Sequence, residues 1–105
     1  MIHNHEAEQS VLGAILLDGI VMEKSNLKVE FFRSHGHQKI FAAIEKIHLC
    51  GEPITLVTVT KELGKALHTI GGVRYLSELA DSVPTLETFE QQQRLVFEAF
   101  FSVVK

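Results

Sequence analysis

The 105-residue sequence contains one cysteine, two prolines and no tryptophan. The single cysteine, Cys50, has no partner within the chain, so the fold cannot depend on an intramolecular disulfide. Seven scattered glycines with two prolines are too few for a collagen-like chain or a flexible linker. No apolar run approaches the ~20 residues that span a bilayer, and the first residues lack the basic flank and apolar core of a signal peptide. We therefore expect a soluble, cytoplasmic protein.

Positive charge is also scarce. Ten Lys and Arg residues face thirteen Asp and Glu residues, which gives a net charge of -3 and a pI of about 6.0. Binding to duplex DNA through its phosphates needs a dense basic face, and this balance does not supply one. One stretch is weakly basic, with Lys24, Lys28, Arg33 and Lys39, but Glu23 and Glu30 dilute its charge. We therefore predict that none of these residues binds DNA.

Motifs for catalysis and nucleotide binding are missing. A phosphate-binding loop needs Gly-x-x-x-x-Gly-Lys-Ser/Thr, and Gly64-Lys65 is followed by Ala66 inside a helical pattern. No Gly-x-Ser-x-Gly elbow is present, and the paired carboxylates such as Glu6 and Glu8 lie at polar helix starts, where the helix dipole explains them. We predict no catalytic and no cofactor-binding residues in this chain.

Six histidines leave a metal site to consider. Two pairs, His3-x-His5 and His35-x-His37, each place two imidazoles close together, and a tetrahedral zinc site would need both pairs to converge. The alternative is that these histidines are solvated loop and cap residues. We favour the second interpretation and predict no metal ligands.

What the chain has is helical periodicity in an ordinary globular composition, 46% hydrophobic and 22% charged. Gly13 falls inside the first apolar stripe, where close approach of a second helix would explain it. Residues 54–60 are rich in β-formers, but no second strand exists to pair with them and Thr55 is a plausible helix N-cap. The sequence predicts an all-α domain, a compact orthogonal bundle of about six short helices over residues 4–17, 20–27, 37–50, 56–67, 73–82 and 88–105.

The last helix is unusually apolar. After Arg94 only Glu98, Ser102 and Lys105 are polar, and four of the eight aromatic residues lie between Phe89 and Phe101. A helix that is apolar nearly all round has to be covered by something. Either it is a fully buried core helix, or the natural chain continues or a second copy packs against it. We prefer a cover supplied by further chain or by a second copy, and we predict an oligomer or hairpin interface at Phe97, Phe100, Phe101 and Val104.

Four blocks of the sequence, taken together, resemble the N-terminal domain of DnaB-type replicative DNA helicases, bacterial or phage-encoded. The first and most specific block is Glu6-Ala7-Glu8-Gln9-Ser10-Val11-Leu12-Gly13-Ala14-Ile15-Leu16-Leu17-Asp18. The others are Glu30-Phe31-Phe32 with His37-x-x-Ile40-Phe41-x-Ala43-Ile44, then Gly51-Glu52-Pro53-Ile54 with Val57-Thr58-Val59, then Gly71-Gly72-x-x-Tyr75-Leu76-x-x-Leu79. The family often has aspartate at Thr55 and asparagine at Thr88, and its final helix is less apolar. These departures suggest a divergent or phage-encoded member.

The resemblance implies that residues 1–105 are a non-catalytic collar domain, a fragment of a longer ATP-dependent DNA helicase. It implies subunit pairing in a hexameric ring, docking of a DnaG-type primase and, in some systems, docking of a helicase loader. ATP, magnesium and DNA would be bound by an absent RecA-like domain, and the last helix would be the first arm of a hairpin. The alternatives are a stand-alone regulatory protein of the same fold, or a small enzyme or metal-binding protein.

Overall fold

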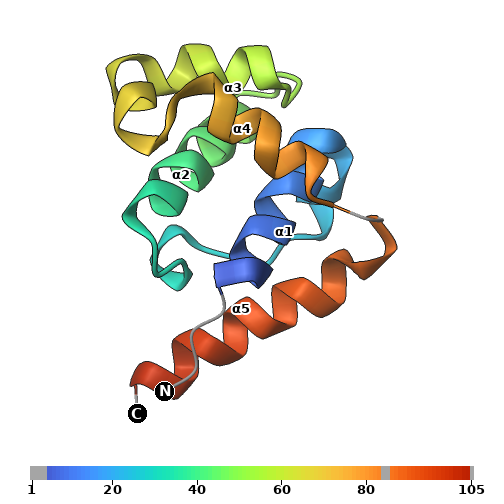
Figure 1. The fold of residues 1–105 in the computed structure, drawn as a ribbon. Coiled ribbons are helices and arrows are strands. Elements are labelled where there is room, and N and C mark those ends of the chain that lie inside the picture. The colour runs from blue at the N-terminus through green and yellow to red at the C-terminus, as the bar shows by residue number, and fades with distance from the viewer. Residues whose placement is uncertain (1–4, 84–85, 105) are drawn as a thin grey trace.

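The structure, a computed structural model, describes residues 5–83 and 86–104, without the side chains of residues 86 and 102–104. Within these ranges the regular elements are all helical, which confirms the predicted all-α class (Figure 1). The α-helices are α1 (His5–Leu17), α2 (His35–Leu49), α3 (Leu56–Leu63), α4 (Gly72–Asp81) and α5 (Phe89–Val104). Four 3-10 helices connect them: η1 (Gly19–Lys24), η2 (Val29–Phe31), η3 (Gly64–Ile70) and η4 (Leu86–Thr88).

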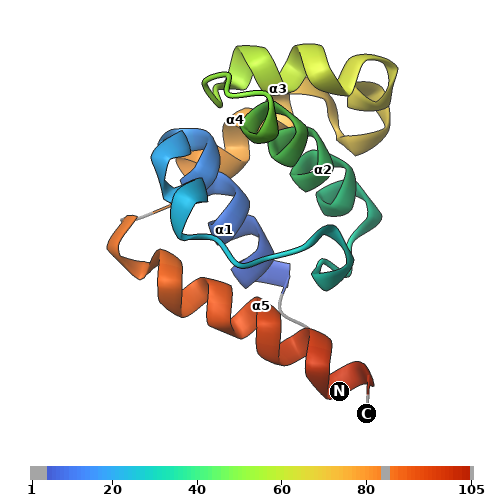
Figure 2. The ribbon, with the colours of Figure 1, turned by 180° about the vertical axis from the view of Figure 1, so that it is seen from behind.

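Helix α1 is the centre of the domain. It packs against α4 and α5 and also contacts α2, while α3 packs on α2 at the end of the molecule away from α5 (Figures 1 and 2). The apolar positions spaced at three and four residues along α1 are fully buried in a single core. The largest fully buried apolar side chains of that core are Leu12, Ile15, Phe32, Ile40, Phe41, Ile44, Leu76 and Leu79.

Gly13 allows α1 and α4 to approach closely, as the sequence predicts. A β-carbon at Gly13 would collide with the carbonyl oxygen of Leu79 on α4 and would lie 2.6 Å from Cγ2 of Val83. The carbonyl belongs to helix backbone, which cannot move aside as a flexible side chain can. Only glycine permits this contact.

The ambiguous segment after Pro53 is helix α3, again as predicted. Thr55 is its N-cap, and its hydroxyl accepts a hydrogen bond from the Thr58 N–H at 3.1 Å. The Thr58 hydroxyl in turn accepts from the Thr55 N–H at 2.9 Å, which completes a reciprocal capping box. The cap fixes the start of the helix at Leu56.

Several predicted boundaries differ from the observed ones. Helix α2 begins at His35 rather than 37, because the Ser34 hydroxyl accepts from the His37 N–H and caps the helix there. Helix α3 ends at Leu63 and continues as 3-10 helix to Ile70, since Gly64 adopts a φ of 52°. The predicted helix over 20–27 is the shorter η1, because the Asn26 N–H is hydrogen-bonded to the Gln93 side chain instead of a helical carbonyl.

Across the described residues, none of the helices combines the length and the apolar character needed to cross a lipid bilayer.

Candidate interaction surface

An aromatic cluster joins α5 to η2. The Phe31 ring, which is buried, is surrounded by three rings of α5, with centroid distances of 4.8 Å to Phe97, 4.7 Å to Phe100 and 5.9 Å to Phe101. Phe101 also packs on Phe97 and Phe100, each with a centroid distance of 5.2 Å. Tilted and edge-to-face rings at these distances attract one another beyond the area that they bury. We call these four residues the aromatic cluster.

The cluster is only partly covered. Phe97 and Phe100 are half-buried, and Phe101 is 50% exposed. These are three of the four residues predicted as an interface, and the structure brings them together; the fourth, Val104, has its side chain outside the described set. Phe31 was missed by the sequence reasoning, although the doublet Phe31-Phe32 in a short turn between polar residues was a usable signal.

The other face of α5 belongs to the core. Phe89, Val96 and Ala99 are buried against the rest of the domain, whereas Glu90, Arg94 and Glu98 are exposed. The interpretation of α5 as a fully buried core helix therefore does not hold, because the described part of α5 has one buried face, a polar face and a partly exposed aromatic face.

A buried amide fixes the position of α5. The Gln93 side chain is 8% exposed, and its Oε1 accepts a hydrogen bond from the Asn26 N–H at 2.8 Å. Its Nε2 donates to the Lys24 carbonyl oxygen at 3.4 Å. Both partners lie in the segment that leads from η1 to η2, so the same amide positions α5 against the segment that carries Phe31.

A polar network connects α1, α2 and α4 inside the core. Glu8 and His37 are 2% and 1% exposed, and Oε1 of Glu8 lies 2.8 Å from Nδ1 of His37. On the other side of the ring, Nε2 lies 2.6 Å from the Tyr75 hydroxyl, which accepts a hydrogen bond from Gln9 at 3.3 Å. The expectation that the helix dipole of α1 alone explains Glu8 was wrong, since its carboxylate is a buried partner of His37.

The carboxylate of Glu8, on α1, also contacts the backbone just before α2. Its Oε2 accepts from the Arg33 N–H at 2.9 Å, and its Oε1 accepts a longer bond from the Ser34 N–H at 3.5 Å. Burial by itself raises the pKa of the Glu8 carboxyl, but the hydrogen bonds from His37, Arg33 and Ser34 and the attraction of His37 outweigh it. The resulting pKa lies below the ordinary value of 4.5. Glu8 is therefore an ionised group held in the core by directed donors.

The two histidine pairs converge only in part. The rings of His5 and His37, one from each pair, stack with centroids 4.8 Å apart, while His3 lies outside the described residues. Potential ligand atoms of His5, Glu8 and His37 all lie within 4.8 Å of one another. Both ring nitrogens of His37 already have hydrogen-bond partners, Glu8 and Tyr75. The interpretation of these histidines as solvated was wrong for His37, which is in the core.

Comparison with known proteins decides the family. The DnaB-like helicase N-terminal domain family matches residues 1–98. This chain is a member of that family. Similar proteins include the replicative DNA helicase DnaB of Geobacillus stearothermophilus, 50% identical over 97 residues, and the replicative DNA helicase DnaC of Bacillus subtilis (strain 168), 41% identical over 99 residues. These alignments cover 89% and 90% of this chain but only 21% and 22% of the relatives, so the chain spans about a fifth of their length.

Solved DnaB structures have the same fold. The N-terminal domain of DnaB helicase from Mycobacterium tuberculosis superposes with a TM-score of 0.86 at 35% sequence identity, over 90% of this chain and 71% of that one. A second match, with a TM-score of 0.88 at 33% identity, is the structure of a DnaB-like replicative helicase and its interactions with primase. It covers 92% of this chain and 24% of that one. The resemblance found in the four sequence blocks is thereby confirmed.

The lowered pKa of Glu8 predicts how this DnaB-type domain responds to acid. The folded state binds fewer protons at Glu8 than the unfolded state, so the stabilisation is complete above the ordinary pKa of 4.5. It is lost as the pH falls through the lower pKa of the folded state. We expect the difference in free energy of unfolding between the wild type and Glu8→Gln to shrink steadily below pH 4.5 in urea titrations. A difference that is independent of pH would contradict this assignment.

Proposed function

We propose that this chain is the non-catalytic N-terminal domain of a hexameric replicative DNA helicase, in which it pairs subunits in the collar of the ring. Its membership of the DnaB-like helicase N-terminal domain family supports the proposal, as does its similarity to replicative helicases more than four times its length. In such a protein, a separate RecA-like domain would bind ATP, magnesium and DNA. Residues 1–105 would then be one part of a longer chain that acts in the cytosol of the bacterium or of a phage host.

We also propose that the domain docks primase, with a helicase loader as a further partner. Support for primase comes from a structural neighbour, which is described as a DnaB-like replicative helicase together with its interactions with primase. The match to that protein covers 92% of the present chain. A domain that meets other proteins needs no dense basic face, which agrees with the net charge of -3.

The observation that carries subunit pairing is the exposed half of the aromatic cluster. Phe101 is 50% exposed and lies beside two half-buried rings, Phe97 and Phe100. Together the three rings form an apolar surface at one edge of the fold. Aromatic residues of this kind are enriched in the centres of protein–protein interfaces, where they contribute most of the binding energy. Phe101 is accordingly the residue expected to contact a second subunit.

Substitution of Phe101 tests this proposal. We expect Phe101→Ser to weaken self-association of the domain by about tenfold or more, the effect of losing one interfacial anchor. Sedimentation equilibrium of the wild type and the variant measures the change. The matched control is Leu49→Ser, because Leu49 is 80% exposed and lies at the end of α2, away from the aromatic cluster. A wild-type monomer at all concentrations, or an equal loss in both variants, would contradict the proposal.

A further inference from the structure

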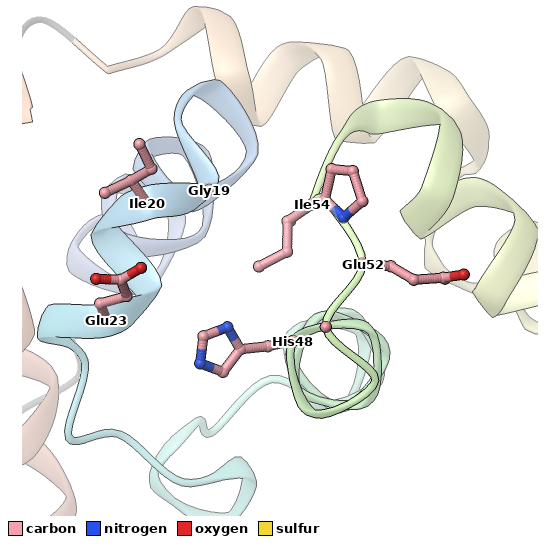
Figure 3. Close-up of a pocket in the computed structure, with 8 residues that line it drawn as sticks. Gly19, Ile20, Glu23, His48, Glu52 and Ile54 are labelled. Carbon is pink, nitrogen blue, oxygen red and sulfur yellow. The ribbon is translucent and has the colours of Figure 1, made fainter.

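A pocket of about 440 Å³ opens between η1 and the loop that joins α2 to α3 (Figure 3). Ile20 and Glu23 lie on the η1 side, and His48 and Ile54 lie on the α2 and loop side, with the side chains of His48 and Ile54 directed toward the space between. Pro53 and Glu52 complete the rim. We call this the Glu23–His48 pocket.

The walls of this pocket are held by contacts within the fold. A β-carbon at Gly19 would lie 2.9 Å from Cβ of Ile54, so the backbone of η1 packs directly on the loop. The Asp18 side chain accepts from the Ile20 N–H at 3.2 Å and caps η1. On the opposite wall, the Gly51 N–H donates to the His48 carbonyl oxygen at 3.0 Å. A hollow that is formed before any ligand arrives loses less entropy on binding.

The pocket combines apolar surface with the negative charge of Glu23. Ile20 is 68% exposed, although it is a large aliphatic residue at the mouth of the pocket. Glu23 is exposed and makes no ion pair with any residue that the structure describes, while the side chain of Glu52 points away from the space between the walls (Figure 3). Neither lysine nor arginine is among the lining residues, and the only basic side chain there is the imidazole of His48. This chemistry fits a group that is positively charged at its tip and aliphatic along its stem.

The surface continues beyond the rim. Glu52 and Pro53 also border a second hollow of about 350 Å³, whose other lining residues include Ile47, Thr58 and Lys61. Two neighbouring hollows that share one ridge suit an extended segment with a side chain in each, more than a single compact molecule. The second hollow contains both charges, Lys61 and Glu62, and Glu62 is already paired with Lys46 at 3.0 Å, so the first hollow is the one that favours positive charge.

We propose that the Glu23–His48 pocket docks a basic linear segment of a partner protein. An arginine of that segment would place its guanidinium against the carboxylate of Glu23 and its methylene stem against the exposed Ile20. The guanidinium forms paired hydrogen bonds with carboxylates, and its stem is compatible with apolar surface. The surface is separate from the aromatic cluster, because α5 lies at the opposite end of the domain from the α2–α3 loop (Figures 1 and 2). Subunit pairing and this docking would therefore be able to occur together.

The test is an NMR titration of the ¹⁵N-labelled chain with a synthetic peptide, acetyl-Leu-Arg-Leu-Arg-amide. We expect amide shifts concentrated at Gly19, Ile20 and Gly51. The same peptide with citrulline in place of arginine keeps the shape but removes the charge, and we expect it to bind about tenfold more weakly.

Two variants locate the binding site. Glu23→Gln is expected to weaken binding of the arginine peptide about tenfold, the loss of one charge-assisted pair. The control, Glu30→Gln, removes an exposed carboxylate on η2 and is expected to leave binding unchanged. The proposal is overturned if the arginine peptide does not bind, if the citrulline peptide binds equally well, or if both variants lose the same affinity. Since the titration does not involve Phe101, a negative result would leave the proposal of subunit pairing unaffected.

Discussion

Replacing Glu8 by alanine is expected to lower the free energy of unfolding by about 3 kcal/mol, the cost of removing one partner from a buried, charge-assisted network. The change leaves Nδ1 of His37 without its acceptor, and it also removes the carboxylate that accepts from the Arg33 and Ser34 N–H groups. It thus weakens the contact of α1 with α2. Through His37, it also weakens the link to Tyr75 of α4. Chemical denaturation with urea at neutral pH measures the loss.

The same helix supplies the matched control. Glu6 lies two residues earlier in the first turn of α1, carries the same charge and is exposed. Glu6→Ala should change stability by less than about 0.5 kcal/mol, as surface substitutions generally do. If the two variants are equally stable, the Glu8 network does not hold the three helices together.

A second large effect is expected from Gly13→Ala. Alanine has a higher helix propensity than glycine by about 1 kcal/mol, so an isolated helix would gain stability. In the fold, the added methyl group would overlap the Leu79 carbonyl oxygen and approach Val83, and α1 and α4 would have to separate. We expect this steric cost to outweigh the propensity gain, with a net loss of about 2 kcal/mol in the free energy of unfolding.

Gly36 provides the comparison for this substitution. It lies in α2, and a β-carbon there would meet its nearest neighbour, the Ser34 hydroxyl oxygen, at 3.7 Å, an ordinary contact distance. Gly36→Ala should therefore be neutral or stabilising by up to about 1 kcal/mol. The two variants are predicted to change stability in opposite directions. A Gly13→Ala protein as stable as Gly36→Ala would show that the α1–α4 contact can relax.

Local signals in the sequence were sufficient for much of the fold. The Asp18-Gly19 stop and the Thr55 cap are each determined by residues within a few positions, and both are where the sequence places them. The sequence also predicts the close approach at Gly13, although not its distant partners, Leu79 and Val83. Two of the boundaries that differ also have local causes, the Ser34 cap and the positive φ of Gly64, whereas the end of η1 depends on a distant residue. Asn26 leaves the helical path because Gln93, 67 residues away, accepts its N–H.

The polar network could not be predicted in this way. Glu8 and His37 are 29 positions apart, and each has a local explanation, as a first-turn acid and as a helix-start histidine. Only the packing of α1 on α2 shows that each is the other's partner. Similarly, the many apolar residues of α5 indicated a surface that something must cover. The sequence did not show that Phe31 covers part of it, because that depends on where η2 lies.

The central proposal is that the exposed part of the aromatic cluster, Phe101 on α5, contacts a second copy of this domain. The most direct measurement places the photo-cross-linking amino acid p-benzoylphenylalanine at position 101, where it replaces one aromatic side chain by another. Illumination followed by denaturing electrophoresis and mass spectrometry is predicted to give a covalent dimer from position 101 and none from position 49. Only monomer from position 101, or equal dimer from both positions, would contradict the account.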